Sequence, residues 1–429
     1  MTTVYWFRND LRLADNPALL AAGNEISPVV LESALDGLPS IRAKSLEAGW
    51  AALNESIGGS LRAVTSLIAT ANEVGTDKVY ASRLYSPVGI AEQKAVGLSL
   101  KENGIDLILG DGNYAVVPGS VRKADGTPYR VYTPFYRGWL QLGWEAPHPG
   151  VEGVRWAEAS GRAPIANDIR AGEAFALETL ERFLRTRVSG YNEDRNRADL
   201  GGTSHLSHAL AHGEIHPRTI LARLSDSAGE ITFAKELAWR EFYADVLWHN
   251  PHTVTEYYEP RFAKMRYDFD QEKFDAWCAG KTGYPMVDAG MRQLLETGWM
   301  HNRVRMIVAS FLVKDLHIEW QHGASWFEKH LSDFDVASNV HGWQWTAGCG
   351  TDASPYYRIF NPITQGYKFD PNGEYVRKFI PELRHLEDQS VHEPWLLIDG
   401  NVHGYPMPIV DHAKEREESL ARLEELKSL

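Results

Sequence analysis

Three segments in the second half of the sequence carry residues that bind phosphates, hold flat rings and pair buried charges. The first segment runs from Tyr191 to Ser207 and contains Gly202-Thr203-Ser204. Side-chain hydroxyls and backbone N–H groups near the start of a helix suit a phosphate group. The same Gly-Thr-Ser run is typical of an ordinary helix cap, so the residues alone leave both interpretations open.

The second segment is a helical stretch that contains Glu236, Trp239 and Arg240. Glu236 and Trp239 lie three residues apart on one helical face, and Arg240 follows Glu236 by one turn. The simplest interpretation of this spacing is an i,i+4 salt bridge beside a half-buried Trp.

The third segment, residues 283–345, places charged residues within an apolar helical pattern. Arg303 and Arg305 precede a long apolar run, and Asp333 and Asp335 follow it. A buried charge needs a partner. The pattern therefore predicts a buried polar pocket in which the two aspartates supply the carboxylates.

A region of alternating β-rich and helical stretches precedes these segments. The β-rich stretches are Val4–Phe7, Pro28–Leu31, Lys78–Ala81 and Asp106–Leu109, and helical spacing occupies Asn16–Ala22, Ala43–Ile57, Val64–Val74 and Ile90–Asn103. Such alternation predicts a doubly wound parallel sheet. No GxGxxG sequence follows the first strand, so a dinucleotide fingerprint is absent there.

The rest of the chain divides by composition. Residues 110–171 are rich in Gly, Pro and aromatic residues without sustained periodicity, which is typical of a long ordered connector. From residue 172 onward the pattern is helical. We therefore expect an α/β + all-α fold: an N-terminal doubly wound parallel-sheet domain (1–130), a connector (131–171) and a larger all-helical domain (172–429).

Charge and cysteine content narrow the class of protein. The formal net charge of −13 argues against non-specific coating of nucleic acid, although a local basic cleft is compatible with DNA binding. The two cysteines, Cys278 and Cys349, exclude a disulfide scaffold and a four-cysteine metal site. The start of the chain lacks a signal-peptide pattern, and no apolar run approaches the roughly 20 residues that span a bilayer. We expect a cytoplasmic protein that does not bind membranes.

Four histidines recur every three or four residues, as in a helical metal site: His205, His208, His212 and His216. Gly213 and Pro217 interrupt the helix between and after them. Imidazole ligands need convergent geometry as well as spacing, so we expect no metal here.

Several motifs, in order and with matching spacing, resemble the photolyase/cryptochrome family over the whole chain. Residues 6–12 resemble the family's opening strand and turn, and residues 280–306 resemble its flavin-site signature. Trp343-Gln344-Trp345 and the stretch Arg358–Pro362 resemble its C-terminal signature. The resemblance is closest to class I-type photolyases for cyclobutane pyrimidine dimers. It implies FAD, active in its reduced form, as the cofactor and UV-damaged DNA as the partner.

The resemblance also implies which residues contact the FAD. They are Tyr191, Thr203, Ser204, Leu206, Ser207, Trp299, Asn302, Arg305, Asp333, Asp335 and Asn339. Asn339 would lie near flavin N5, where Asn is usual in photolyases and Asp or Cys in cryptochromes, so it favours repair over signalling. His205 replaces an Arg that is common in the family, which puts one contact near the phosphate loop in doubt.

A lesion pocket is implied in the same way, formed by Glu236, Trp239, Asn302, Met306 and Trp345. In it, Glu236 would hydrogen-bond a flipped-out dimer, and the two tryptophans would hold its rings. Electron transfer from photoexcited reduced FAD would open the dimer, and the electron would return to the flavin. Asn302 stands where the branch that repairs (6-4) photoproducts has a second His, which indicates cyclobutane dimers.

Further contacts with DNA are implied for four arginines: Arg195, Arg240, Arg303 and Arg358. They would supply the local positive potential that the net charge conceals. A folate or 8-hydroxy-deazaflavin antenna is compatible with the N-terminal domain, and so is an empty antenna site. The family resemblance implies a monomer.

A chain of aromatic residues that photoreduces the flavin is also implied. Trp343 and Trp320 occupy its inner two places, and Tyr267 stands where the outer Trp is usual. We expect Tyr267, or the neighbouring Trp277, to end the chain. The alternative is that Tyr267 only packs.

Two other classes of protein remain as alternatives. A cryptochrome-type photoreceptor would act through partner proteins. It is disfavoured because both lesion tryptophans are present and the chain ends in a short helix-like stretch, residues 413–429. A non-photochemical flavoprotein, or a DNA-binding relative without activity, would bind oxidised FAD without photoreduction.

Overall fold

The computed structural model describes residues 2–352 and 357–428, and these fall into two compact units. The first unit comprises residues 1–189 and 204–251, and the second comprises residues 190–203 and 252–429. The chain therefore leaves the first unit and later returns to it.

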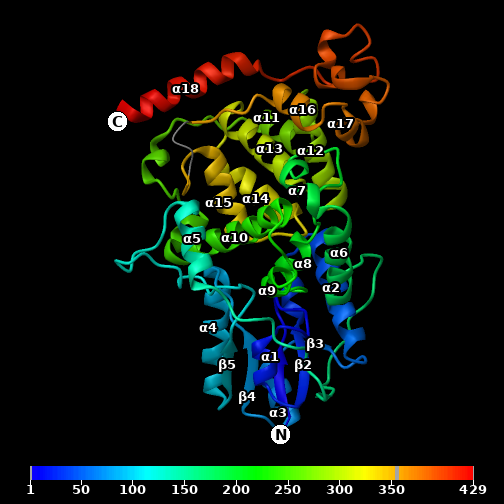
Figure 1. Ribbon diagram of the computed structural model, residues 1–429, viewed down its shortest axis with the longest axis vertical. Coiled ribbons are helices and arrows are strands. Elements are labelled where there is room, and N and C mark those ends of the chain that lie inside the picture. Colours follow the sequence, from blue (N-terminus) through cyan, green and yellow to red (C-terminus); the bar gives the residue numbers. More distant parts are fainter. Residues whose placement is uncertain (1, 353–356, 429) are drawn as a thin grey trace. The chain divides into compact units, whose positions relative to one another are not determined.

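The first unit contains a six-stranded sheet in which every pairing is parallel. Its strands are β1 (Thr3–Trp6), β2 (Glu25–Leu31), β3 (Arg62–Val64), β4 (Lys78–Ser82), β5 (Asp106–Gly110) and β6 (Arg155–Trp156). The strand order is β3-β2-β1-β4-β5, with β6 also paired to β2 (Figure 1). Strand order reverses beside β1, as in doubly wound folds. The predicted fold class, an α/β part followed by helices, is confirmed.

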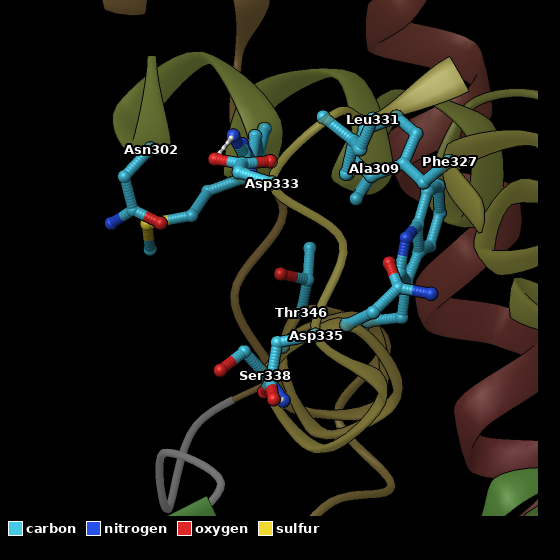
Figure 2. A pocket seen from close by; sticks show the side chains of 13 residues that line it. Asn302, Ala309, Phe327, Leu331, Asp333, Asp335, Ser338 and Thr346 are labelled. Atoms are coloured by element: carbon cyan, nitrogen blue, oxygen red, sulfur yellow. Dashed lines mark hydrogen bonds and ion pairs between the residues drawn. The ribbon is translucent and has the colours of Figure 1, made fainter. Parts of the chain in front are cut away.

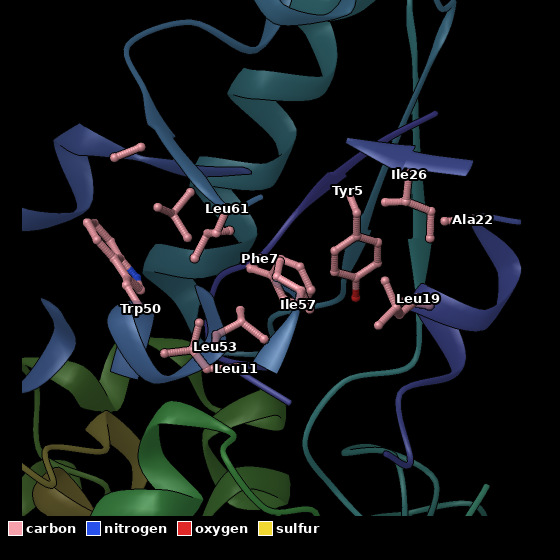
Figure 3. Close-up of a cluster of buried hydrophobic side chains, with 13 residues drawn as sticks. Tyr5, Phe7, Leu11, Leu19, Ala22, Ile26, Trp50, Leu53, Ile57 and Leu61 are labelled. Carbon is pink, nitrogen blue, oxygen red and sulfur yellow. The ribbon is translucent and has the colours of Figure 1, made fainter. Parts of the chain in front are cut away.

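Helices cover both faces of this sheet, which explains why its strands read as continuous apolar runs. Tyr5 and Phe7 point to one face, where they join a cluster that includes Trp50 and Leu53 (Figure 3). The alternate residues of β1 belong to a second cluster on the other face. Successive side chains of a strand point to opposite faces, so a single strand feeds both cores.

The helices of the first unit are partly those that the sequence predicts. They are α1 (Pro17–Ala21), α2 (Ser40–Ser56), α3 (Leu67–Val74), α4 (Pro87–Glu102), α5 (Tyr132–Leu142), α6 (Glu173–Thr186), α8 (Ser207–His212), α9 (Pro217–Leu221) and α10 (Ala228–His249). Asn16 caps α1 by accepting a hydrogen bond from the backbone N–H of Leu19 at 3.1 Å, and Pro17 occupies the first turn, as expected.

The boundaries of the two compact units differ from the domain boundaries that we expected from composition. Helices α6 and α8–α10 belong to the same unit as the sheet, although their sequence is purely helical. The connector is ordered, as expected, and contributes α5 and β6. Val64, expected at the start of a helix, ends strand β3 instead.

Two carboxylates on α10 hold the connector of the first unit. Glu241 is fully buried and accepts hydrogen bonds from the backbone N–H groups of Ala115 and Val116 and from the indole N–H of Trp139, at 2.5, 3.1 and 2.6 Å. Asp245 accepts a hydrogen bond from the N–H of residue 119 at 2.7 Å. Burial raises the pKa of Glu241 to about 6, although these donors act against the rise.

A buried ion pair joins the loop after β1 to α9. Asp15 is inaccessible to solvent, and Arg218 donates two hydrogen bonds to it, at 3.2 and 2.6 Å. Asp15 also accepts from the backbone N–H of His148 at 3.1 Å. Burial alone would raise the pKa of Asp15, but His216 and Arg218 outweigh it and hold the pKa below its ordinary range. Partners about 200 residues apart in sequence thus satisfy one carboxylate.

The second unit is built from helices. They are α7 (Tyr191–Asp194), α11 (Gln271–Cys278), α12 (Pro285–Thr297), α13 (Asn302–Lys314), α14 (Trp320–His330), α15 (Val336–Ala347), α16 (Pro362–Phe369), α17 (Glu374–Phe379) and α18 (His412–Ser428). Helices α12, α13, α14 and α15 pack against one another (Figure 1). The helix expected at residues 413–429 is α18, and His412 anchors it through a hydrogen bond of 2.5 Å with Asp315.

The loop before α12 is fastened by one buried carboxylate. Asp288 accepts hydrogen bonds from the backbone N–H and hydroxyl of Thr282 and from the N–H of Gly283, at 2.8, 2.7 and 3.0 Å. The hydroxyl of Tyr405 donates a fourth, at 2.6 Å.

Within residues 2–352 and 357–428, no helix has both the length and the apolar character needed to cross a bilayer.

Candidate active site

The predicted polar pocket exists in the second unit, between α13, α14 and α15. It is a cavity of about 120 Å³ that opens to solvent. Its lining residues are Asn302, Arg305, Met306, Ala309, Phe327, Leu331, Asp333, Asp335, Ser338, Asn339, Gly342, Trp343 and Thr346. Figure 2 shows Asn302 and Asp333 on one side of this space, Asp335 and Ser338 on another, and Phe327 with Leu331 on a third.

The expected pair of opposite charges lies on the rim of the cavity. The guanidinium of Arg305 donates to Asp333 at 2.7 Å, drawn as a dashed line in Figure 2, and also to the carbonyl of Met300 at 2.8 Å. The side chain of Asp333 is 1% exposed, so its carboxylate has almost no contact with water. Its second oxygen, Oδ1, has no hydrogen-bond partner among the residues that the structure describes. An unused acceptor therefore remains buried in the cavity wall.

Helix α15 positions several lining residues. Asp335 caps the helix, because its carboxylate accepts from the backbone N–H of Ser338 at 2.8 Å. One turn on, the amide nitrogen of Asn339 donates to the carbonyl of Ala324 at 3.1 Å. This leaves the side-chain carbonyl of Asn339 as the group that can accept a hydrogen bond from a ligand.

Gly342, also on α15, leaves the cavity room for a ring. A Cβ atom added at Gly342 would meet no atom within 4 Å, so any larger side chain would occupy the cavity. The indole N–H of Trp343 is buried without a partner within the described parts of the chain. An open space bordered by Phe327, Leu331 and Trp343, with unused polar atoms at its edge, fits an isoalloxazine ring. These residues therefore fit FAD.

Two residues expected to contact the lesion line the same cavity. Asn302 begins α13, which His301 caps through its Nδ1, and Met306 follows Asn302 by one turn. Trp345 lies outside the cavity lining and is partly exposed. Its indole N–H donates to the carbonyl of Asp352 at 3.1 Å.

The other two expected lesion residues, Glu236 and Trp239, lie on α10 of the first unit. Both are partly exposed. The ring of Trp239 stacks on Tyr132, with centroids 3.7 Å apart and planes 7° apart. One face of Trp239 is therefore covered. No local sequence pattern links Tyr132 to Trp239, so sequence reasoning missed this contact.

Two of the four arginines expected to contact DNA are engaged within their own units. Arg240 donates to the carbonyls of Asn113 and Leu210, at 2.8 and 3.4 Å. Arg303 donates to the side chain of Asn196 at 2.7 Å, and its guanidinium also lies over the ring of Phe369. Arg195 is partly exposed and Arg358 is exposed.

The residues expected around the FAD phosphates divide between the two units. Tyr191 and Thr203 belong to the second unit, whereas Ser204, Leu206 and Ser207 belong to the first. The hydroxyl of Ser204 accepts from the N–H of Leu206 at 3.3 Å, and Ser207 begins α8. Trp299 lies just before α13 and is half-buried.

The four spaced histidines differ in their local contacts and backbone conformation. His216 caps α9, and the rings of His208 and His212 pack 4.4 Å apart. His205 has a positive φ of 56°. Over residues 2–352 and 357–428, no group of three His, Cys, Asp or Glu residues is placed to hold a metal ion.

Comparison with known proteins agrees with this geometry. Residues 3–152 match the family model of DNA photolyase, and residues 233–425 match the FAD binding domain of DNA photolyase. A deoxyribodipyrimidine photo-lyase from Agrobacterium fabrum is 40% identical over 97% of this chain and 96% of its own.

Two solved structures are similar over nearly the whole chain. A bacterial class III photolyase from Agrobacterium tumefaciens has a TM-score of 0.90 and 38% identity, covering 100% of this chain and 98% of that one. An archaeal photolyase from Sulfolobus tokodaii, solved with two FAD molecules, has a TM-score of 0.86 and 26% identity, covering 99% and 100%.

Proposed function

This chain belongs to the DNA photolyase family, and from that premise we propose that it uses light to split cyclobutane pyrimidine dimers in DNA. One observation carries the proposal. Asn302 and Met306, expected at the lesion, line the same cavity as Asn339 and Asp335, expected at the flavin. A dimer held by the first pair would lie next to a ring held by the second, as short-range electron transfer requires.

The FAD contacts that we propose are those that the family resemblance implies. Phosphate contacts are proposed for Tyr191, Thr203, Ser204, Leu206 and Ser207, and ring contacts for Trp299, Asn302, Arg305, Asp333, Asp335 and Asn339. When bound, reduced FAD supplies the photoexcited electron that opens the dimer. Asn339 would accept a hydrogen bond at the ring edge, and the Arg305–Asp333 pair would place a fixed positive group beside the flavin.

The lesion would be held by flat and polar side chains. Trp239 and Trp345 are proposed to stack on the flipped dimer, each contact worth roughly 1–3 kcal/mol. Tyr132 stacks on Trp239 and would fix its ring in one orientation before DNA arrives. Glu236 would hydrogen-bond the base edge and stabilise the radical anion formed by electron transfer.

Arginines would supply the positive potential for DNA. Arg195 and Arg358 are proposed to contact phosphates directly. Arg240 and Arg303 are proposed contacts too, but each also holds backbone or side-chain groups of its own unit. Substitution of either one is therefore expected to lower stability as well as DNA affinity. A monomer acting in the cytoplasm is the form we propose.

A second chromophore is proposed for the first unit. A cavity of about 90 Å³ there is lined by Trp6, Phe7, Arg8, Asn9, Leu31, Ala34, Leu46, Trp50, Leu84 and Glu92. The guanidinium of Arg8 lies 4.5 Å from the ring centroid of Trp6. Apolar and aromatic walls, with the Arg8–Glu92 ion pair (3.5 Å) beside them, suit a flat antenna such as a folate or a deazaflavin. The absorption spectrum of chromophores released by denaturation separates the two, and FAD alone would contradict this part of the proposal.

The direct test is repair itself. FAD-loaded protein is reduced with dithionite, mixed with an oligonucleotide that contains a thymine dimer, and illuminated with blue light while base absorbance is followed. We expect light-dependent recovery that is lost in Glu236→Ala and Trp345→Ala. Trp345→Phe, which keeps a flat ring, and Glu296→Ala, an exposed acid on α12, are matched controls.

Two outcomes would contradict the proposal. No recovery from reduced, FAD-loaded protein would favour a photoreceptor that acts through partner proteins. Bound oxidised FAD without photoreduction or repair would favour a non-photochemical flavoprotein.

A further inference from the structure

A cluster of aromatic and acidic side chains lies in the second unit beside the start of α14. Trp320 is fully buried, and the ring of Tyr257 meets it edge-on, with centroids 6.1 Å apart and planes 86° apart. The hydroxyl of Tyr257 donates to the carboxylate of Glu319 at 2.9 Å. An indole, a phenol and a base thus follow one another in direct contact.

The flavin cavity adjoins this cluster through Trp343. Trp343 lines the cavity, and its ring packs on the backbone of α14 at Gly323, where an added Cβ would lie 2.1 Å from the ring. Gly323 follows Trp320 by three residues, so both lie on one face of α14. Trp343 therefore packs on the helix that carries Trp320, and Trp320 in turn contacts Tyr257.

Tyr257 differs from Trp343 and Trp320 because a neighbouring base can accept its proton. Loss of an electron makes a phenol a strong acid, so a tyrosine is oxidised readily only where a base takes its proton. The indole nitrogens of Trp343 and Trp320 have no partner among the described residues. Burial, together with the charge of Glu319, raises the pKa of Tyr257, so the phenol is protonated at neutral pH and its proton is available for transfer.

Tyr267 lies beside Tyr257 but lacks this base. No hydrogen bond joins its hydroxyl to a carboxylate within the residues that the structure describes. Trp277, the other expected terminus, directs its ring edge at Trp343 with centroids 6.1 Å apart. Its indole N–H donates to the carbonyl of Val308 at 3.0 Å, and a backbone carbonyl does not take a proton.

We propose that Tyr257, with Glu319 as its proton acceptor, is the terminal electron donor for photoreduction of the flavin. The inference rests on the proposed function, because it assumes a flavin in the cavity. With oxidised FAD bound and excited by light, Trp343 would supply an electron to it and would be refilled from Trp320. Tyr257 then gives its electron to the Trp320 radical cation and its proton to Glu319, which leaves a neutral phenoxyl radical. A thiolate in solution returns the electron, and Glu319 returns the proton to Tyr257 across their hydrogen bond.

The test uses FAD-loaded full-length protein with oxidised flavin. Samples are illuminated with blue light without added thiol, frozen, and examined by electron paramagnetic resonance. A parallel sample contains ring-deuterated tyrosine, which narrows a tyrosyl signal and leaves a tryptophanyl signal unchanged. The variants are Tyr257→Phe and Glu319→Gln, with Tyr267→Phe as the matched control. Bound FAD is quantified in each by its absorbance.

We expect a tyrosyl signal in the wild type and in Tyr267→Phe, and its loss in Tyr257→Phe and Glu319→Gln at equal FAD content. A signal that persists in Tyr257→Phe, that is lost in Tyr267→Phe, or that is absent from the wild type would overturn the proposal. Glu319→Gln keeps the phenol, so persistence of the signal there refutes the proton acceptor even where Tyr257→Phe folds poorly.

Chemical reduction separates this inference from the proposed function. Dithionite supplies the electron without the aromatic chain, so the reduced Tyr257→Phe variant is expected to repair dimers at the wild-type rate. Failure of the reduced wild type to repair would refute the proposed function, whereas the radical experiment would still decide the identity of the donor.

Discussion

Filling the space at Gly342 is expected to change the stability of the empty and the FAD-loaded protein in opposite directions. Gly342 lies within α15 and lines the cavity, and a Cβ placed there meets no atom within 4 Å. In the Gly342→Leu variant the new side chain has helical backbone geometry and open space, but that space is where we place the flavin ring. The folded helix is therefore stabilised, whereas the binding of FAD is weakened.

Both magnitudes follow from these surroundings. Replacing a Gly in a helix interior stabilises the folded chain by about 0.5–1 kcal/mol. For a unit as large as the second one (residues 190–203 and 252–429), a change of about 1 kcal/mol in the free energy of unfolding shifts Tm by roughly 2–4 °C. The Tm of the apoprotein is therefore expected to rise slightly. In the wild type, FAD at 100 times its Kd adds about 2.7 kcal/mol, or roughly 5–10 °C. The variant is expected to lose this second increment.

The assay compares thermal unfolding of apoprotein and FAD-reconstituted protein, with FAD affinity from fluorescence titration. Gly97→Ala is the control, because Gly97 also lies within a helix, α4, and its Cβ would make only an ordinary contact of 3.5 Å with Leu107. It should raise stability without changing FAD affinity. Unchanged FAD affinity in Gly342→Leu would refute the placement of the flavin. A lower Tm of the Gly342→Leu apoprotein would contradict the open space that we infer beside Gly342.

Three further predictions concern groups in either unit. Burial raises the pKa of Glu241 from an ordinary 4.5 to about 6, so the folded protein holds this proton more tightly than the unfolded chain does. Its contribution to the unfolding free energy should therefore fall by about 2 kcal/mol in total as pH rises from below 4.5 to above 6. Urea unfolding across this range should show a smaller fall in Glu241→Gln, and an equal fall would contradict the assignment. Gly323→Ala should cost roughly 1–3 kcal/mol, because its Cβ would lie 2.1 Å from Trp343. It should also slow photoreduction in flash spectroscopy, and normal kinetics would count against the route through Trp343. Asp333→Ala removes the carboxylate of a mostly buried pair and should cost roughly 3 kcal/mol, with loss of bound FAD. Asp333→Asn, which keeps the shape, should lose less, and an unchanged Tm in Asp333→Ala would refute the estimate.

The sheet was predictable where its strands have four residues or more. Residues 78–81 and 106–109 stood out as apolar runs, and they form most of β4 and β5. Strand β3 has three residues and β6 has two, and segments so short carry no period. These strands depend on partners distant in sequence, since both pair with β2.

The site was predictable where a single residue needs a partner of known kind. Arg305 within an apolar helix called for a carboxylate, and Asp333 supplies it. Long-range packing left no such signal. Tyr132 and Trp239 stack although 107 positions separate them, and Arg240 turns to backbone carbonyls of the connector and α8. The similarity to class I-type enzymes and the roles of individual site residues stay predictions.

The interrupted course of the first unit has a consequence for how the protein is made. Asp15 emerges from the ribosome early, while its buried partner Arg218 follows about 200 residues later. At about 5–20 residues per second, that interval lasts on the order of 10–40 s. During this time the nascent sheet lacks α8, α9 and α10, and the carboxylate of Asp15 is hydrated rather than paired. A ribosome stalled between residues 156 and 251 would therefore display a complete sheet within an unfinished first unit, and this is the stretch of synthesis in which we expect chaperones to bind.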